Sequence, residues 1–96
     1  MIMRTIQTRL NSAVSLVGPS LAKAGWADRV DTISSLIDNN EEGIALELLC
    51  SNLYEFDIPI PFRAFGLIRE VGQEMNENGA GYDSDLWLDL ESLVKG

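Results

Sequence analysis

Carboxylates and a single thiol are the side chains of this chain that could do acid–base or nucleophilic chemistry. The 96 residues include 15 Asp and Glu, one Cys and no His. Without histidine the chain lacks the commonest general base and metal ligand, and the Ser–His and Cys–His nucleophile systems are excluded. Cys50 lies in an apolar segment with no positive charge beside it, so we expect it to be an inert core residue.

Pairs of carboxylates could still catalyse a reaction such as glycoside hydrolysis, in which two acids with different pKa values flank a cleft. In this chain the acids fall on the polar faces of predicted helices, where a charged side chain is ordinarily solvated. A chain of 96 residues also has little room for a deep cavity beside its core. We therefore predict that the protein is not an enzyme.

Two short stretches have part of a ligand-binding motif. Residues 76–81 have the glycine of a calcium loop, but Ala80 stands at the fifth ligand position and Trp87 stands where a bidentate glutamate is needed. Residues 83–86, Asp-Ser-Asp-Leu, are similar to the Asp-Ser-Leu motif of acyl carrier proteins, with an extra acid and a place near the C-terminus. Ser84 is a better helix cap than a prosthetic-group site. The sequence predicts neither a metal nor a cofactor.

Five segments with helical spacing of apolar residues must position the acids, and no run of alternating β-branched residues indicates a strand. Gly18-Pro19 is expected to end the first helix, and Asn40 is a plausible N-cap for the third. The prolines at 59 and 61 predict an extended link, with Pro61 as the first residue of the next helix. The predicted helices cover residues 2–17, 25–38, 41–57, 61–76 and 84–95. The expected fold is an all-α, compact single-domain bundle of about five helices spanning residues 1–96.

The third segment is expected to be a buried central helix around which the others pack. From Ile44 to Phe56 it is apolar on most sides of a helical wheel. Glu47, Ser51 and Glu55 are spaced four apart and form one narrow polar line, with Tyr54 on its shoulder. This line is where the central helix could meet a partner.

The acidic charge balance suits a basic protein partner, or simply keeps the chain soluble. The net charge is −8. Residues 1–30 hold four basic residues and one acid, a net +3, whereas residues 31–96 hold three basic residues and fourteen acids, a net −11. Nucleic acid and anionic membrane surfaces would be repelled by such a chain. We find no signal peptide and no membrane-spanning run, and the lone cysteine fits a reducing cytoplasm.

Three polar faces are candidate contact surfaces. Trp26 and Phe65 lie on predicted core faces, whereas Tyr54, Tyr82 and Trp87 lie at edges beside acids, where aromatic residues favour binding. The candidate residues, in order of preference, are Glu47, Tyr54, Glu55 and Asp57; then Glu70, Glu74 and Glu77; then Asp85, Trp87 and Asp89.

Residues 39–61 resemble the MafI-type immunity proteins and the related immunity proteins of contact-dependent growth inhibition systems. The shared pattern is an acidic-Gly start, the stretches 45–50 and 53–57, and a Pro-x-Pro link. The resemblance is best over residues 30–77. It implies a small, acidic, helical antidote in the cytoplasm that binds and blocks the basic C-terminal domain of its cognate toxin, often a ribonuclease. The family has no fixed contact residues to transfer, so the candidate faces rest on exposure and charge.

Two other functions stay open. A helical adaptor or self-associating module would present an apolar surface at Leu36, Leu46 or Leu88, the leucines outside the main apolar stripes. A small enzyme or acyl carrier would use the carboxylates or Ser84. Of these readings, the immunity protein, favoured as a monomer, explains the charge best.

Overall fold

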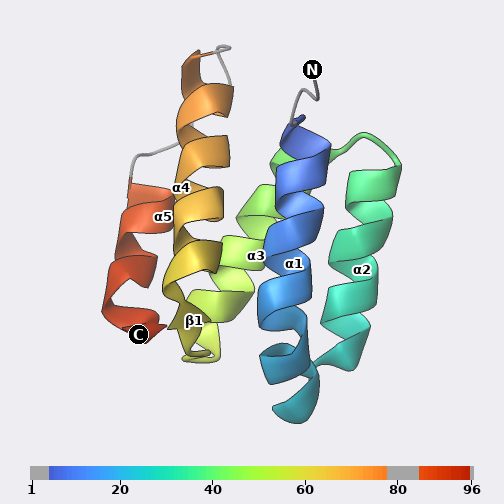
Figure 1. Cartoon of the computed structure of the whole chain (residues 1–96). Coiled ribbons are helices and arrows are strands. Elements are labelled where there is room, and N and C mark those ends of the chain that lie inside the picture. Colours follow the sequence, from blue (N-terminus) through green and yellow to red (C-terminus); the bar gives the residue numbers. More distant parts are fainter. Residues whose placement is uncertain (1–4, 78–84, 96) are drawn as a thin grey trace.

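The four long segments with helical periodicity all form helices in the computed structural model, which describes residues 5–77 and 85–95 (Figure 1). The prediction of an all-α fold is confirmed. The prediction of about five helices is not, because the last segment forms one α-helical turn that continues as a 3-10 helix. The elements are α1 (Ile6–Lys23), α2 (Ala27–Asp38), α3 (Glu42–Glu55), β1 (Ile60–Pro61), α4 (Phe62–Glu77), α5 (Asp85–Leu88), η1 (Asp89–Leu93) and β2 (Val94–Lys95).

α1 lies between α2 and α4, and α3 crosses behind them (Figure 1). α5 and η1 pack against both α4 and α3. The side chains that all of these elements contribute to the centre form one continuous core. Its largest fully buried members are Leu10, Leu21, Ile33, Ile37, Leu46, Leu49, Leu53, Ile60, Ile68 and Leu90. The radius of gyration of 12.3 Å is that of a compact body of this length.

α1, α2 and α3 all end in the same left-handed turn. The residue after each C-cap has positive φ: Gly25 (98°), Asn40 (62°) and Asp57 (55°). The next N–H then donates back to the carbonyl five residues earlier, over 2.9, 2.9 and 3.0 Å, in the pairs Trp26–Leu21, Glu41–Leu36 and Ile58–Leu53. Asn40 therefore closes α2. Its predicted role as the N-cap of α3 is wrong, because Glu41 occupies that position.

The predicted end of the first helix at Gly18-Pro19 is also wrong. α1 continues through Pro19 to Lys23. Pro19 is exposed, whereas Leu21 in the following turn is fully buried. Burial of a leucine contributes about 2 kcal/mol, which helps to offset the hydrogen bond that proline cannot make.

Two short strands, which the sequence did not predict, join the link before α4 to the end of η1. β1 and β2 pair in parallel, with Ile60 opposite Val94 and Pro61 opposite Lys95. Ile60 is fully buried beneath this pairing. Pro61 thus belongs to β1, and α4 begins one residue later than expected, at Phe62. The pairing fixes η1 against the body of the protein.

Candidate functional site

α3 has one solvent-exposed side, so the prediction of a helix buried on most sides is not confirmed. Its core side buries Ala45, Leu46, Leu49, Cys50, Asn52 and Leu53. Its exposed side carries Ile44, Glu47, Ser51, Tyr54 and Glu55. The predicted polar line of Glu47, Ser51 and Glu55 is therefore exposed. Ile44 and Tyr54 are also exposed, by 53% and 57%. The sequence places Tyr54 on the shoulder of the polar line, so only Ile44 adds apolar surface that the wheel assigns to the buried sides.

α5 and η1 add further exposed residues beside α3. They pack against α3 and leave Leu88, Asp89 and Glu91 exposed. Leu88 is 44% exposed, whereas the other two leucines predicted for an adaptor surface are half-buried (Leu36) or fully buried (Leu46). We give the name acidic face to a set of exposed residues from α3, α5 and η1. They are Ile44, Glu47, Ser51, Tyr54, Glu55, Leu88, Asp89 and Glu91.

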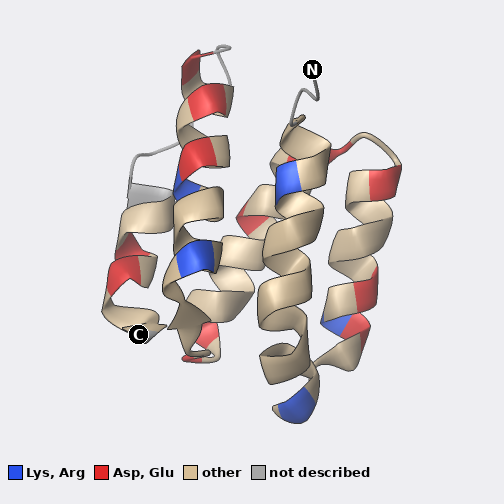
Figure 2. Ribbon diagram, viewed as in Figure 1, with Lys and Arg blue, Asp and Glu red and all other residues tan. Residues whose placement is uncertain are grey.

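The segments that build the acidic face contain no basic residue. Residues 41–57 and 85–93 hold eight acids and no Lys or Arg: Glu41, Glu42, Glu47, Glu55, Asp57, Asp85, Asp89 and Glu91. Residues 6–40 and 62–77, which include α1, α2 and α4, hold six acids and five basic residues, a net charge of −1. Figure 2 shows the Lys and Arg bands on α1, α2 and α4. The unbalanced negative charge of these ranges thus lies in α3, α5, η1 and the residues that flank α3.

Asp57 and Asp85, both predicted as contact residues, lie at the margins of this surface. Asp57 is exposed in the left-handed turn that ends α3, so it lies beyond the helical strip. Asp85 begins α5, and its side chain lies outside the described side chains. Tyr82 and Ser84 lie outside the described residues altogether.

Trp87 does not contribute to the surface. The prediction that it lies at an exposed edge beside acids is wrong, because it is 3% exposed and packs over Gly72 of α4. Gly72 leaves the space that the indole fills, and this complementarity between two segments is invisible in local sequence periodicity. Phe65 is buried, which confirms its predicted core position.

Of the three acids on α4 predicted as contact residues, Glu70 and Glu74 bind a basic residue of the same chain. Arg9 donates from Nη1 to Glu70 Oε1 over 2.7 Å and from Nη2 to Glu74 Oε2 over 2.6 Å. The Arg9 side chain is 5% exposed, and its Nε also donates to the carbonyl of Thr5. Burial lowers the pKa of Arg9, but the hydrogen bonds and charges of Glu74 and Glu70 more than compensate and raise it overall. Only Glu77 of this predicted strip lacks a contact with Arg9, so α4 is a weaker candidate than α3.

Two further predictions concern Cys50 and Trp26. Cys50 is buried with 1% exposure, as predicted, and burial raises its pKa to about 12, so its thiol stays protonated at neutral pH. Trp26 is half-buried and stacks on Phe56, with ring centroids 4.0 Å apart and ring planes at 5°. The Arg29 guanidinium lies 5.7 Å from the Trp26 ring centroid. This stack joins the start of α2 to the end of α3.

Among the described residues, no three or more His, Cys, Asp or Glu side chains are grouped to hold a metal ion. Within the same ranges, none of the helices combines the length and hydropathy that a membrane crossing requires. Comparison of the chain with protein-family models, with curated proteins and with solved structures finds no match in any of the three.

Proposed function

We propose that this protein is an immunity protein that neutralises a cognate toxin by binding its basic domain through the acidic face. One observation carries the proposal: the segments forming this face hold eight acids without a single Lys or Arg. The resemblance of residues 39–61 to MafI-type and contact-dependent growth inhibition immunity proteins supplies the kind of partner. The site of action would be the cytoplasm.

The composition of the acidic face suits recognition of a basic protein surface. Charges of one sign speed the encounter with an oppositely charged partner and disfavour wrong partners. Ile44, Tyr54 and Leu88 are exposed by 53%, 57% and 44% and provide apolar contacts that carboxylates alone do not. Affinity in protein interfaces comes largely from a few such well-packed side chains, among which Tyr is enriched.

A ribonuclease toxin would fit this surface for a physical reason. An enzyme that holds RNA presents basic side chains to the phosphates, and those side chains attract carboxylates equally well. Glu47 and Glu55 of α3 would then occupy positions that phosphates take in the substrate complex. Binding would block access of RNA without any chemistry by the immunity protein.

Co-purification tests the proposal. The probe is the C-terminal domain of the protein encoded directly upstream, mixed with the full chain at low and at high salt. We expect a complex that high salt weakens, because ions screen exposed charges. We also expect co-expression of this chain to restore the growth of cells that express the toxin domain. Absence of both complex and rescue would refute the immunity function.

Self-association is the second candidate function, and the exposure of Leu88 at 44% favours it. A symmetric dimer through the acidic face would bring the same carboxylates of two copies together, which is unfavourable. We therefore expect a monomer. Sedimentation velocity over a hundredfold range of concentration distinguishes the two functions, since an adaptor of this kind would show a concentration-dependent dimer.

A further inference from the structure

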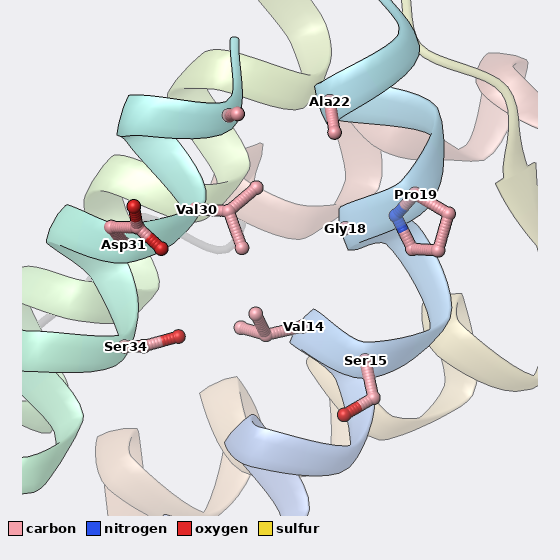
Figure 3. A pocket seen from close by; sticks show the side chains of 9 residues that line it. Val14, Ser15, Gly18, Pro19, Ala22, Val30, Asp31 and Ser34 are labelled. Carbon is pink, nitrogen blue, oxygen red and sulfur yellow. The ribbon is translucent and has the colours of Figure 1, made fainter.

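A groove of about 410 Å³ lies between α1 and α2 (Figure 3). None of its lining residues belongs to α3, α5 or η1, so it is separate from the acidic face. Its walls are small and apolar, with Val14, Gly18 and Ala22 on α1 facing Ala27 and Val30 on α2. A Cβ on Gly18 would lie 3.5 Å from Val30 Cγ1, which shows how closely the two helices approach at this point.

The charged and side-chain polar groups of the groove are a carboxylate and two hydroxyls. Figure 3 shows Asp31 and Ser34 on α2 and Ser15 opposite them on α1. Within the described part of the chain, none of these three side chains has a hydrogen bond or an ion pair. No Lys or Arg is among the residues that line the groove.

Pro19 adds a backbone acceptor. It lies inside α1 and has no N–H, so it cannot donate the usual i+4 hydrogen bond to the carbonyl of Ser15. Ser15 and Pro19 both line the groove, since residues four apart share one side of a helix. The Ser15 carbonyl therefore lacks its usual helical donor at a residue that lines the groove from α1, whereas Asp31 and Ser34 lie across the groove on α2.

We propose that this groove binds an arginine side chain presented by a partner polypeptide. The apolar walls suit the three methylenes of arginine, and the acceptors suit its guanidinium, which carries five N–H donors and no acceptor. A guanidinium can bridge a carboxylate and a neighbouring carbonyl or hydroxyl in one plane, which an ammonium point charge does less well. The site is a second contact point, and it does not depend on the acidic face.

The direct test uses N-acetyl-arginine amide as the probe and the ¹⁵N-labelled full chain. Saturable changes in amide chemical shift are expected at Gly18, Ala27 and Ser34, with none at Glu47 or Glu55. The citrulline analogue has nearly the same shape without the charge and is expected to leave the groove unchanged. Equal shifts with both probes, or no saturable shift with the arginine amide, would overturn the proposal.

Two variants and one matched control test where the probe binds. Asp31→Asn is expected to weaken the arginine amide by about two- to fivefold, as loss of one exposed ion pair would. Asp28→Asn removes the same charge from the same helix outside the groove and is the matched control, expected to bind like the wild type. Ala22→Leu keeps a strong helix former but fills the groove, and is expected to abolish the shifts.

Three other results would contradict the proposal. Equal weakening by Asp28→Asn and Asp31→Asn would mean that the probe responds to overall charge. Normal binding by Ala22→Leu would place the probe elsewhere. Shifts at Gly18 and Ala27 that grow with protein concentration in the absence of the probe would show that a second copy of this chain occupies the groove.

Discussion

The indole of Trp87 lies against Gly72, so close that a Cβ at position 72 would come within 2.4 Å of Trp87 Cε3. The contact joins α5 to α4 across the sequence gap between them. It also places Trp87 in the core, with 3% exposure, and leaves its neighbour Leu88 on the acidic face. Trp87 thus forms the buried side of α5 and η1 together with Leu90 and Leu93.

Gly72→Ala is expected to displace Trp87 and to reduce the free energy of unfolding by about 1–3 kcal/mol, as overpacking of a core does. In a Trp26→Phe background Trp87 is the only tryptophan, and its fluorescence should shift to the red. Gly66→Ala is the matched control in α4, because a Cβ there meets nothing within 4 Å. That variant should be as stable as the parent or more so. Equal behaviour of the two variants would contradict the packing.

Arg9→Gln is expected to reduce the free energy of unfolding by about 1–3 kcal/mol, the usual contribution of hydrogen bonds to charged groups. The reason is that Arg9 joins α1 to Glu70 and Glu74 of α4 from a side chain only 5% exposed. Urea denaturation measures the change. Lys23→Gln removes the same charge from an exposed position of α1 and should leave stability unchanged. If both variants have the same free energy of unfolding, the contacts of Arg9 with Glu70 and Glu74 do not stabilise the fold.

The buried thiol of Cys50 is expected to make the free energy of unfolding fall at alkaline pH. Burial raises its pKa from 9.0 to about 12, so the folded protein holds the thiol proton more tightly than the unfolded chain does. This contribution is complete below pH 9, begins to fall once the unfolded thiol ionises, and is lost as the pH rises through about 12.

Between pH 8 and pH 10 the wild type should therefore lose roughly 1 kcal/mol more stability than Cys50→Ala, since one pH unit above the unfolded pKa corresponds to about that energy. Denaturation of both proteins at the two pH values measures the difference, and other ionising groups cancel in it. Parallel losses in the two proteins would show that the thiol is not protected by burial.

Leu88→Ser and Tyr54→Ser are expected to change the free energy of unfolding little, because Leu88 is 44% and Tyr54 57% exposed. They should nevertheless weaken the binding of the toxin domain at least about fivefold each, as loss of an interface anchor does. Phe62→Ser is the matched control: Phe62 is 66% exposed and lies outside the acidic face. Equal binding by all three variants would show that Leu88 and Tyr54 are not part of the interface.

Local pattern in the sequence predicts the helices well, because each helix buries apolar residues at helical spacing. Ile33 and Ile37 of α2 and Ile68 and Val71 of α4 are fully buried on the faces that the pattern assigns. The pattern assigns Ile44 to an apolar side, but this residue stands in the first turn of α3 and is 53% exposed. The sequence pattern does not predict that α1 continues through Pro19, because proline locally disfavours a helix. In the folded protein the burial of Leu21 in the next turn helps to offset that cost.

Contacts between distant segments could not be predicted in this way. Arg9 meets acids 61 and 65 residues later in the chain, and nothing near Arg9 marks it as a buried side chain. The same holds for Trp87 over Gly72 and for the pairing of Ile60 with Val94. The exposure of Glu47 and Glu55 could be predicted, because helical geometry alone separates these two residues from the apolar positions of α3.

The most direct test of the central claim is a calorimetric titration of the upstream-encoded toxin domain into this protein, comparing the wild type with Glu47→Gln/Glu55→Gln. The control is Asp28→Asn/Asp38→Asn, which removes the same two charges from exposed positions on α2. We predict that the α3 double variant binds at least about tenfold more weakly, whereas the α2 double variant binds within about twofold of the wild type. Equal affinities for all three proteins would contradict the claim that the acidic face is the binding surface.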